Sequence, residues 1–432
     1  MRSRCHLAVP VWVLAAVSLG LSVLAMINSL PLARWAYADW VAVSAATRES
    51  LLYGGPWFAA WGAWVAGRYL GPRSLLCPPS AARSGPRVVR AQLTLLGVAA
   101  ACGHLLGLLP VLTWTAIQAR TGALNPLVLL GSIAVLLAFG ALGYLIGCGL
   151  PRTASVLGAV VASFGVILMV DTWGPALAPL RLSTPAAGFY ETAVVAGFRV
   201  AFFAVCALAL SAASAQLVAE RSVVFNTWAL GGLLTLTAPL ALGFVAKSTA
   251  PLAVQREANP VPVCSSAGPI DVCVHPAKVD LLAALDGMVD NVMATVDHRP
   301  AVPVAGLYDS SLDREQLPNN FVLLNIEASD QQWLDWAAGD LASQLAGQPA
   351  CLHRGDAFGD DVAPLLDHMA VSEAFASWIA RNAGFMAPQF DVRGSSPQTL
   401  RLEQLPTDQV QSLYHLSAAE IASCRLPSSA IP

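Results

Sequence analysis

Seven long runs of apolar residues occupy the first 247 positions of the chain. Each run is close to the roughly 20 residues that an α-helix needs to cross a bilayer. Short polar or basic segments separate the runs, which lie at 8–29, 51–70, 92–116, 127–149, 154–172, 195–217 and 223–246. The pattern predicts a polytopic α-helical membrane domain of about seven spans over residues 1–247.

The pattern changes after residue 247. A linker at 250–262 is rich in proline and polar residues, and apolar residues then recur at helical spacing through 276–296. Strand-like runs follow at 302–308 and 321–326, and further helices are expected near 361–383 and 406–423. Residues 248–432 are therefore predicted to form a small α+β domain.

Composition and charge support this division. Only 12% of the residues are charged and 56% are hydrophobic, which is too little charge to cover the surface of a soluble chain of this length. Residues 1–247 hold 15 basic and 5 acidic side chains, whereas residues 248–432 hold 9 basic and 22 acidic side chains. The sequence thus joins a basic membrane part to an acidic, water-soluble part.

The distribution of arginine predicts the orientation, because cytoplasmic loops are enriched in basic residues. With the N-terminus inside, the cytoplasmic segments contain Arg2, Arg4, Arg68, Arg73, Arg83, Arg87, Arg90, Arg152 and Arg221. The opposite loops contain Arg34, Arg48, Arg120 and Arg181. Seven spans that start inside place everything after Lys247 outside, so we expect a multi-pass plasma-membrane protein with an extracytoplasmic C-terminal domain.

A cleaved signal peptide is an alternative for the first run, because Arg2 and Arg4 precede it and Ala36-Tyr37-Ala38 is similar to a processing site. The apolar run is longer than the core of a usual signal peptide, which favours a retained span.

The cysteines of the C-terminal domain indicate disulfides. Cys264, Cys273, Cys351 and Cys424 all lie in this domain, and an even number in an oxidising compartment is what a disulfide framework requires. Four cysteines allow three pairings. Short strand-like runs flank Gly268-Pro269, so closure of Cys264 with Cys273 across a hairpin is favoured, which leaves Cys351 with Cys424. A zinc site needs more ligands than His275 provides.

Polar and aromatic residues within the spans are candidates for a substrate path. Trp57, Trp61 and Trp64 recur on one face of the second span, where they form either a packing and interface stripe or a wall for a bulky lipophilic substrate. His104 lies near the middle of the third span, and an intramembrane ionisable residue is either functional or hydrogen-bonded to a neighbouring helix.

Two further residue sets in the spans have structural interpretations. Gly140, Gly143 and Gly147 on the fourth span favour close helix packing. Asp171 and Arg199 are expected near the outer ends of their spans, where they either pair or meet water.

The C-terminal domain offers no familiar catalytic motif. It contains neither H-E-x-x-H nor G-x-S-x-G, and its carboxylates lack the loop spacing of a calcium site. We therefore expect a solvated acidic surface, no catalytic residues, no metal and no cofactor.

The layout of the first six runs resembles the permease subunits of actinobacterial ATP-binding-cassette exporters of the drug- and antibiotic-export type. A basic loop at 71–90 joins runs two and three, a short turn at 147–152 joins runs four and five, and a Pro- and Gly-rich segment at 173–191 joins runs five and six. The alanine-rich, lysine-poor composition is also similar to that of high-GC actinobacteria. The resemblance covers roughly residues 8–217 and is one of layout rather than of a sharp motif.

The resemblance implies a permease that moves an amphipathic peptide, drug or lipid, and that dimerises with itself or with a paralogue. The chain contains no G-x-x-x-x-G-K-[ST], so ATP is expected on a separate ATPase subunit. By the same resemblance, that subunit would dock on the loop that carries Arg73, Arg83, Arg87 and Arg90. Membrane lipid is an expected partner and nucleic acid is not. The seventh span and the C-terminal domain are additions to the family layout, and the N-terminus is too short for the amphipathic helix that usually precedes the first span.

Two other functions fit the sequence. The protein is alternatively a membrane-anchored receptor or scaffold whose extracytoplasmic domain binds a partner, or a membrane-bound hydrolase with a degenerate or unfamiliar site.

Overall fold

A computed structural model of the chain describes residues 9–70, 85–172, 188–219, 254–257, 260–266, 270–312, 320–327, 329–354, 363–386 and 397–432. The chain divides into two compact units. The first comprises Met1–Arg34, Ala38–Pro185 and Phe189–Arg256, and the second comprises Trp35–Tyr37, Ala186–Gly188 and Glu257–Pro432.

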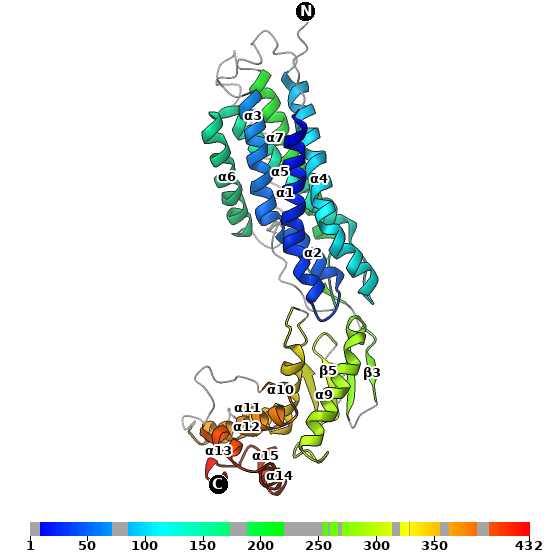
Figure 1. The fold of residues 1–432 in the computed structure, drawn as a ribbon, viewed down its shortest axis with the longest axis vertical. Helices are drawn as coiled ribbons and strands as arrows, with labels where there is room; N and C mark the ends of the chain where they lie inside the picture. The colour runs from blue at the N-terminus through cyan, green and yellow to red at the C-terminus, as the bar shows by residue number, and fades with distance from the viewer. Residues whose placement is uncertain are drawn as a thin grey trace, which may run out of the picture. The chain divides into compact units, whose positions relative to one another are not determined.

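The first unit is a bundle of long helices that run side by side (Figure 1). Its long helices are α1 (Val11–Ser29), α3 (Leu51–Tyr69), α4 (Gly85–Gln118), α5 (Pro126–Gly149), α6 (Arg152–Thr172) and α7 (Ala193–Ala219). The shorter elements are the 3-10 helix η1 (Leu30–Arg34), helix α2 (Trp40–Glu49), and strands β1 (Phe189–Glu191) and β2 (Val254–Arg256).

Five of the described helices, α1, α4, α5, α6 and α7, are long and apolar enough to cross a membrane. The chain is therefore a multi-pass membrane protein. Helix α3 occupies the second predicted run but is not among the five, because its tryptophan, tyrosine and glycine residues lower its hydropathy. The seventh predicted run, at 223–246, lies outside the described residues.

Glycines bring α3 and α5 into close contact, as predicted. A Cβ atom on Gly143 would overlap the carbonyl oxygen of Ala59, and one on Gly147 would overlap that of Ala63. Small residues allow the backbones of membrane helices to approach so closely. The side chain of Asn125 caps the first turn of α5 by accepting from the N–H of Leu127 at 3.0 Å.

The short β1–β2 ladder pairs the segment just before α7 with a segment that lies well beyond the end of that helix in the sequence. Strands β1 and β2 are antiparallel, with Glu191 opposite Val254. The described chain leaves α7 at Ala219 and reappears at Val254, beside the opposite end of that helix.

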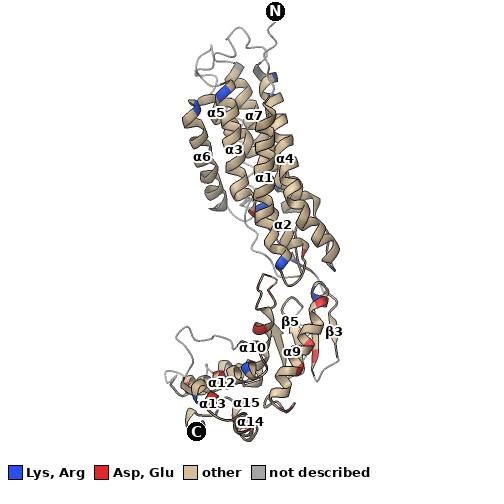
Figure 2. Cartoon of the chain, viewed as in Figure 1, with Lys and Arg blue, Asp and Glu red and all other residues tan. Residues whose placement is uncertain are grey.

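Basic side chains gather at one end of the bundle. Arg68 lies in the last turn of α3, Arg87 and Arg90 lie near the start of α4, and Arg152 begins α6. Figure 2 shows blue segments at this end of the bundle and others towards the opposite end, where Arg34 lies in η1 and Arg120 follows α4, whereas most of the helices between are uncharged.

The second unit is a small α+β fold around a four-stranded sheet of order β3-β4-β5-β6. Its strands are β3 (Val263–Ser265), β4 (Asp271–Val274), β5 (Gly306–Asp309) and β6 (Phe321–Leu324). The β3–β4 pair is antiparallel, whereas β4, β5 and β6 are parallel.

Helices account for most of the rest of this unit. They are η3 (Pro276–Leu281), α9 (Leu282–Thr295), α10 (Trp333–Leu345), α11 (Gln348–Arg354), α12 (Ala363–Asn382), α13 (Pro397–Gln404), α14 (Thr407–Leu416), α15 (Ala418–Ala422) and η6 (Ser428–Ala430). Alternate strand residues, among them Val272, Leu307 and Leu324, pack with α9, α10 and α12 into one core.

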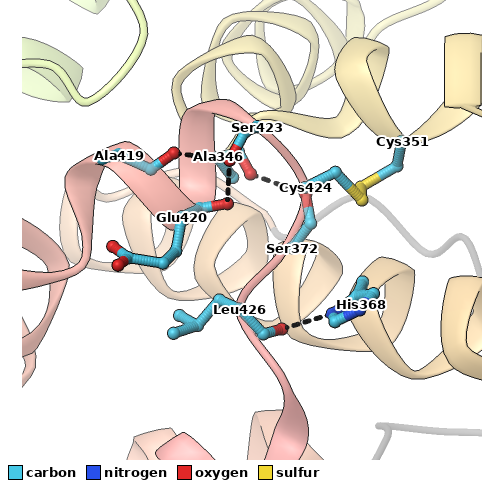
Figure 3. The surroundings of a disulfide bond; sticks show 9 residues. All are labelled: Ala346, Cys351, His368, Ser372, Ala419, Glu420, Ser423, Cys424 and Leu426. Atoms are coloured by element: carbon cyan, nitrogen blue, oxygen red, sulfur yellow. Dashed lines mark hydrogen bonds between the residues drawn. A yellow bond between two sulfur atoms is a disulfide. The ribbon is translucent and has the colours of Figure 1, made fainter.

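Two disulfides close this unit, and both are the predicted pairs. Cys264 and Cys273 lie directly opposite each other in the β3–β4 hairpin. Cys351 of α11 is joined to Cys424, just after α15, beside the hydrogen bond between His368 and the Leu426 carbonyl (Figure 3). Disulfides persist in oxidising compartments, so this unit is consistent with an extracytoplasmic location.

Candidate functional site

A ladder of four tryptophans runs along α1 and α3, and we name it the tryptophan ladder. Trp57, Trp61 and Trp64 follow one another on α3 with ring centroids 6.0 and 5.8 Å apart. Trp12 of α1 contacts Trp61 at 6.0 Å and Trp64 at 5.4 Å. All four contacts are edge-to-face, the geometry that aromatic quadrupoles favour.

Two arginines end the ladder. The guanidinium carbon of Arg68 lies 5.1 Å from the Trp64 ring centroid and that of Arg152 lies 5.2 Å from it. Both arginines are exposed. Cations at this distance from an indole face are held by the ring quadrupole, so the ladder has an aromatic body and a cationic end.

The ladder lies on the surface of the bundle. Trp12 is 53% exposed and Trp57 is 39% exposed, whereas Trp61 and Trp64 are intermediate. The Trp57 indole sits against Gly20 of α1, where an added Cβ would lie 2.5 Å from its Nε1. The i, i+4, i+7 spacing identified the three tryptophans of α3, but it gave no indication of Trp12.

His104 lies on α4 and is only 2% exposed. Its Nε2 has no hydrogen-bond partner among the described residues. Gly103 and Gly107, on either side of it in sequence, are packed against Ser18 and Ser22 of α1. The described ring contacts of the tryptophan ladder do not include His104.

The predicted ATPase-docking loop is described only in part. Arg87 and Arg90 are exposed at the start of α4. Arg73 and Arg83 lie outside the described residues.

A buried ionic cluster of Arg48, Glu191 and Arg199 lies in the first unit, and it was not predicted from the sequence. Nη2 of Arg48, in the last turn of α2, donates to both carboxylate oxygens of Glu191, and Nη1 of Arg199 donates to Oε1 at 3.2 Å. All three side chains are at most 4% exposed. Arg199 therefore pairs with Glu191 in a buried site, where water or Asp171 had been expected.

A small cavity adjoins this cluster. It is lined by Arg48, Leu51, Leu127, Gly131, Ser132, Val135, Ala196, Arg199 and Phe203. Its volume of about 10 Å³ is near the lower limit for one water-sized particle. It has no room for a bulky transported compound.

A second polar cluster lies at the carboxyl ends of the parallel strands in the second unit. Asp309 ends β5 and is fully buried, where it accepts from Nζ of Lys278 at 2.8 Å and from the hydroxyl of Ser311 at 2.7 Å. The backbone N–H groups of Ser311 and His275 complete its hydrogen bonds at 3.2 Å. Lys278 also donates to the carbonyl of Ile326 at 3.2 Å.

His275 borders this cluster. Its Nδ1 accepts from the N–H of Ala277 at 3.2 Å, so the neutral ring carries its proton on Nε2, which lies 3.3 Å from Oε2 of Glu257. Burial lowers the pKa of His275, and the nearby Glu257 only partly offsets this. Gly188, at φ +87°, lies against the ring, where a Cβ would come within 3.4 Å of it.

This arrangement differs from a Ser-His-Asp catalytic triad. In a catalytic triad the serine hydroxyl donates to the histidine that takes its proton, whereas Ser311 donates to Asp309. Among the described residues, no group of three His, Cys, Asp or Glu side chains is placed to hold a metal ion. The cluster is a fully hydrogen-bonded ionic core at the sheet edge.

No model of a known protein family matches the chain, and no curated protein or solved structure is similar enough to be matched with it.

Proposed function

We propose that the chain is the permease subunit of an ATP-driven transporter that moves an amphipathic peptide, drug or lipid, and that a separate ATPase chain supplies the energy. The observation that carries this proposal is the tryptophan ladder with its two terminal arginines. It forms a strip on the bundle surface that is aromatic along its length and cationic at one end, which is the complement of an amphipath with an anionic head.

The length of the ladder favours a substrate surface over a simple interface anchor. Trp57 and Trp64 are seven residues apart, which corresponds to about 10 Å along a helix. Tryptophans that anchor a helix lie in a belt at the level of the headgroups. A ladder that continues about 10 Å inward from its arginines can accompany the apolar part of a bound molecule as well as its head.

The topology proposed for this transporter has the basic end of the bundle in the cytoplasm. The gathering of Arg68, Arg87, Arg90 and Arg152 at one end supports it, because cytoplasmic loops carry an excess of basic residues. The ATPase would dock at this end, on the segment that leads into α4. The disulfide-bonded unit would lie outside the plasma membrane, where it gates the exit or receives substrate.

The test is purification of the tagged full chain in mild detergent from its native host, followed by mass spectrometry of the proteins that accompany it. We expect a P-loop ATPase in stoichiometric amount. Reversing the exposed charges with Arg87→Glu and Arg90→Glu should remove the ATPase while the helical circular dichroism is kept. The matched control is Arg299→Glu, an exposed arginine of the second unit. Absence of any ATPase, or its retention by the double variant, would contradict the proposal.

The receptor or scaffold alternative has one observation in its favour. Tyr308 and Phe321 form an edge-to-face pair 6.1 Å apart on the sheet face that alternates with the core face, and both are only partly buried. Such a pair is a suitable anchor for a protein partner. If this alternative is right, Tyr308→Ser with Phe321→Ser will remove a surface or secreted partner from the purified protein, and no ATPase will accompany the wild type.

A further inference from the structure

One nitrogen of the buried Arg48 guanidinium lacks a hydrogen-bond partner among the described residues. Its Nη2 is used fully by the carboxylate of Glu191, but its Nη1 has no partner among the described residues. The side chain is only 4% exposed, so bulk water does not serve this nitrogen. A buried donor without a partner is costly, and more so when the group is charged.

The cavity described above has Arg48 among the residues that line it. Arg48 and Arg199 both line it, and these two side chains share the carboxylate of Glu191. The hydroxyl of Ser132, the other polar group in the lining, donates to the carbonyl of Val128 at 3.0 Å. Among the polar side-chain atoms of the lining, Nη1 of Arg48 is the donor without a partner in the described part of the chain, and the lining apart from Arg48, Arg199 and Ser132 is apolar or glycine.

We propose that this cavity is a binding site for one small inorganic anion of about the size of chloride. The positive potential of two guanidinium groups attracts a negative charge, and the N–H groups of Arg48 Nη1 supply its hydrogen bonds. The small size of the cavity favours a monatomic anion over the larger tetrahedral sulfate and phosphate ions. The site is separate from the tryptophan ladder, and the proposal does not depend on transport.

The first experiment measures the thermal midpoint of the purified full chain in detergent while chloride replaces gluconate at constant ionic strength. Gluconate is too large for the cavity. We expect the midpoint to rise with chloride and to saturate, with a total shift on the order of 3 °C. Bromide should give the same rise and sulfate should not. A water molecule in the cavity would also satisfy Nη1, but it would give no anion dependence, so a flat response would overturn the proposal.

Three variants test whether the chloride response depends on Arg48 and Glu191. Arg48→Gln removes the unpartnered donor and one positive charge, so the saturable chloride response should disappear. Glu191→Gln removes the carboxylate that competes for both guanidinium groups, so half of the response should occur at a lower chloride concentration. Arg299→Gln, at an exposed site, should respond as the wild type does. Equal responses in the wild type and Arg48→Gln would overturn the proposal.

A measurement on the wild type covers the case in which Arg48→Gln does not fold. Crystals grown or soaked in bromide should show an anomalous scattering peak within hydrogen-bond distance of Arg48 Nη1. A well-ordered Arg48 with no bromide peak beside it would refute the proposal.

Discussion

The buried ion pair in the second unit gives the sharpest energetic prediction. Lys278 is fully buried, and its Nζ donates to Asp309 and to the Ile326 carbonyl while it lies 5.3 Å from the Tyr37 ring centroid. Lys278→Met keeps most of the side-chain volume and removes the charge. The carboxylate of Asp309 then stays buried with its three remaining hydrogen bonds but without a counter-charge.

Removing one partner of a buried ion pair typically costs 3–5 kcal/mol. Because each 1.4 kcal/mol corresponds to a factor of ten in an equilibrium constant, the opening equilibrium of the sheet should shift by roughly 10²- to 4 × 10³-fold. The parallel strands β4, β5 and β6 meet at this cluster, so their backbone amides should report the shift.

Hydrogen exchange with mass spectrometry on the full chain measures this change locally and does not require the two units to unfold together. We expect peptides that cover β4 to β6 to exchange roughly 10²-fold faster or more in Lys278→Met, whereas peptides from the membrane helices should be unchanged. The control Arg299→Met replaces an exposed cation and should leave exchange within a factor of two or three. An increase of less than tenfold in β4–β6 would refute the reasoning that this pair stabilises the sheet edge.

Three further predictions concern stability. Replacing Cys351 and Cys424 with serine opens a loop with a sequence separation of 73 and should lower the free energy of unfolding by about 4 kcal/mol. Pulse proteolysis would show this as a lower denaturant midpoint, and an unchanged midpoint would count against a structural role for the disulfide. Burial raises the pKa of Asp340 to about 6, so the free energy of unfolding should fall as pH rises from about 4 through 6 and this carboxyl ionises. Asp340→Asn should therefore be more stable than the wild type by roughly 2 kcal/mol at pH 8, with no such gain at pH 4. A gain that does not vary with pH would argue against this cause. Gly143→Ala should destabilise the bundle by about 1–3 kcal/mol in detergent melts, because the added methyl group would overlap the backbone of α3. The control Gly165→Ala on α6, where the added methyl group has open space, should not destabilise it. Equal melting of the two variants would show that α3 and α5 do not pack as described.

The features that could be predicted from the sequence are those with a local or periodic signature. Apolar runs predicted the long helices α1 and α3 to α7, and the glycine spacing on α5 predicted close helix packing without naming α3 as the partner. The pairing of Cys264 with Cys273 followed from a nine-residue separation around a turn, and the other disulfide followed because two cysteines remained.

The features that were missed join segments far apart in the chain. Arg48 and Glu191 are 143 positions apart, and nothing periodic connects them. One signal was available, because Glu191 is one of only 5 acidic residues before position 248 and Arg199 follows it within a helix. Trp12 joins the ladder only because α1 packs beside α3. The parallel order of β4 to β6 was likewise missed, since strand runs as short as these do not reveal their partners.

The most direct test of the transport proposal is reconstitution of the purified chain, together with the ATPase that accompanies it, into phospholipid vesicles that contain a trace of fluorescently labelled anionic lipid. We expect ATP to redistribute this lipid between the leaflets, as measured by its accessibility to dithionite. We also expect Arg68→Gln with Arg152→Gln to abolish the redistribution while ATP hydrolysis persists. Redistribution that is unchanged in the double variant, or a complex that hydrolyses ATP and moves no amphipath, would contradict the role given to the tryptophan ladder.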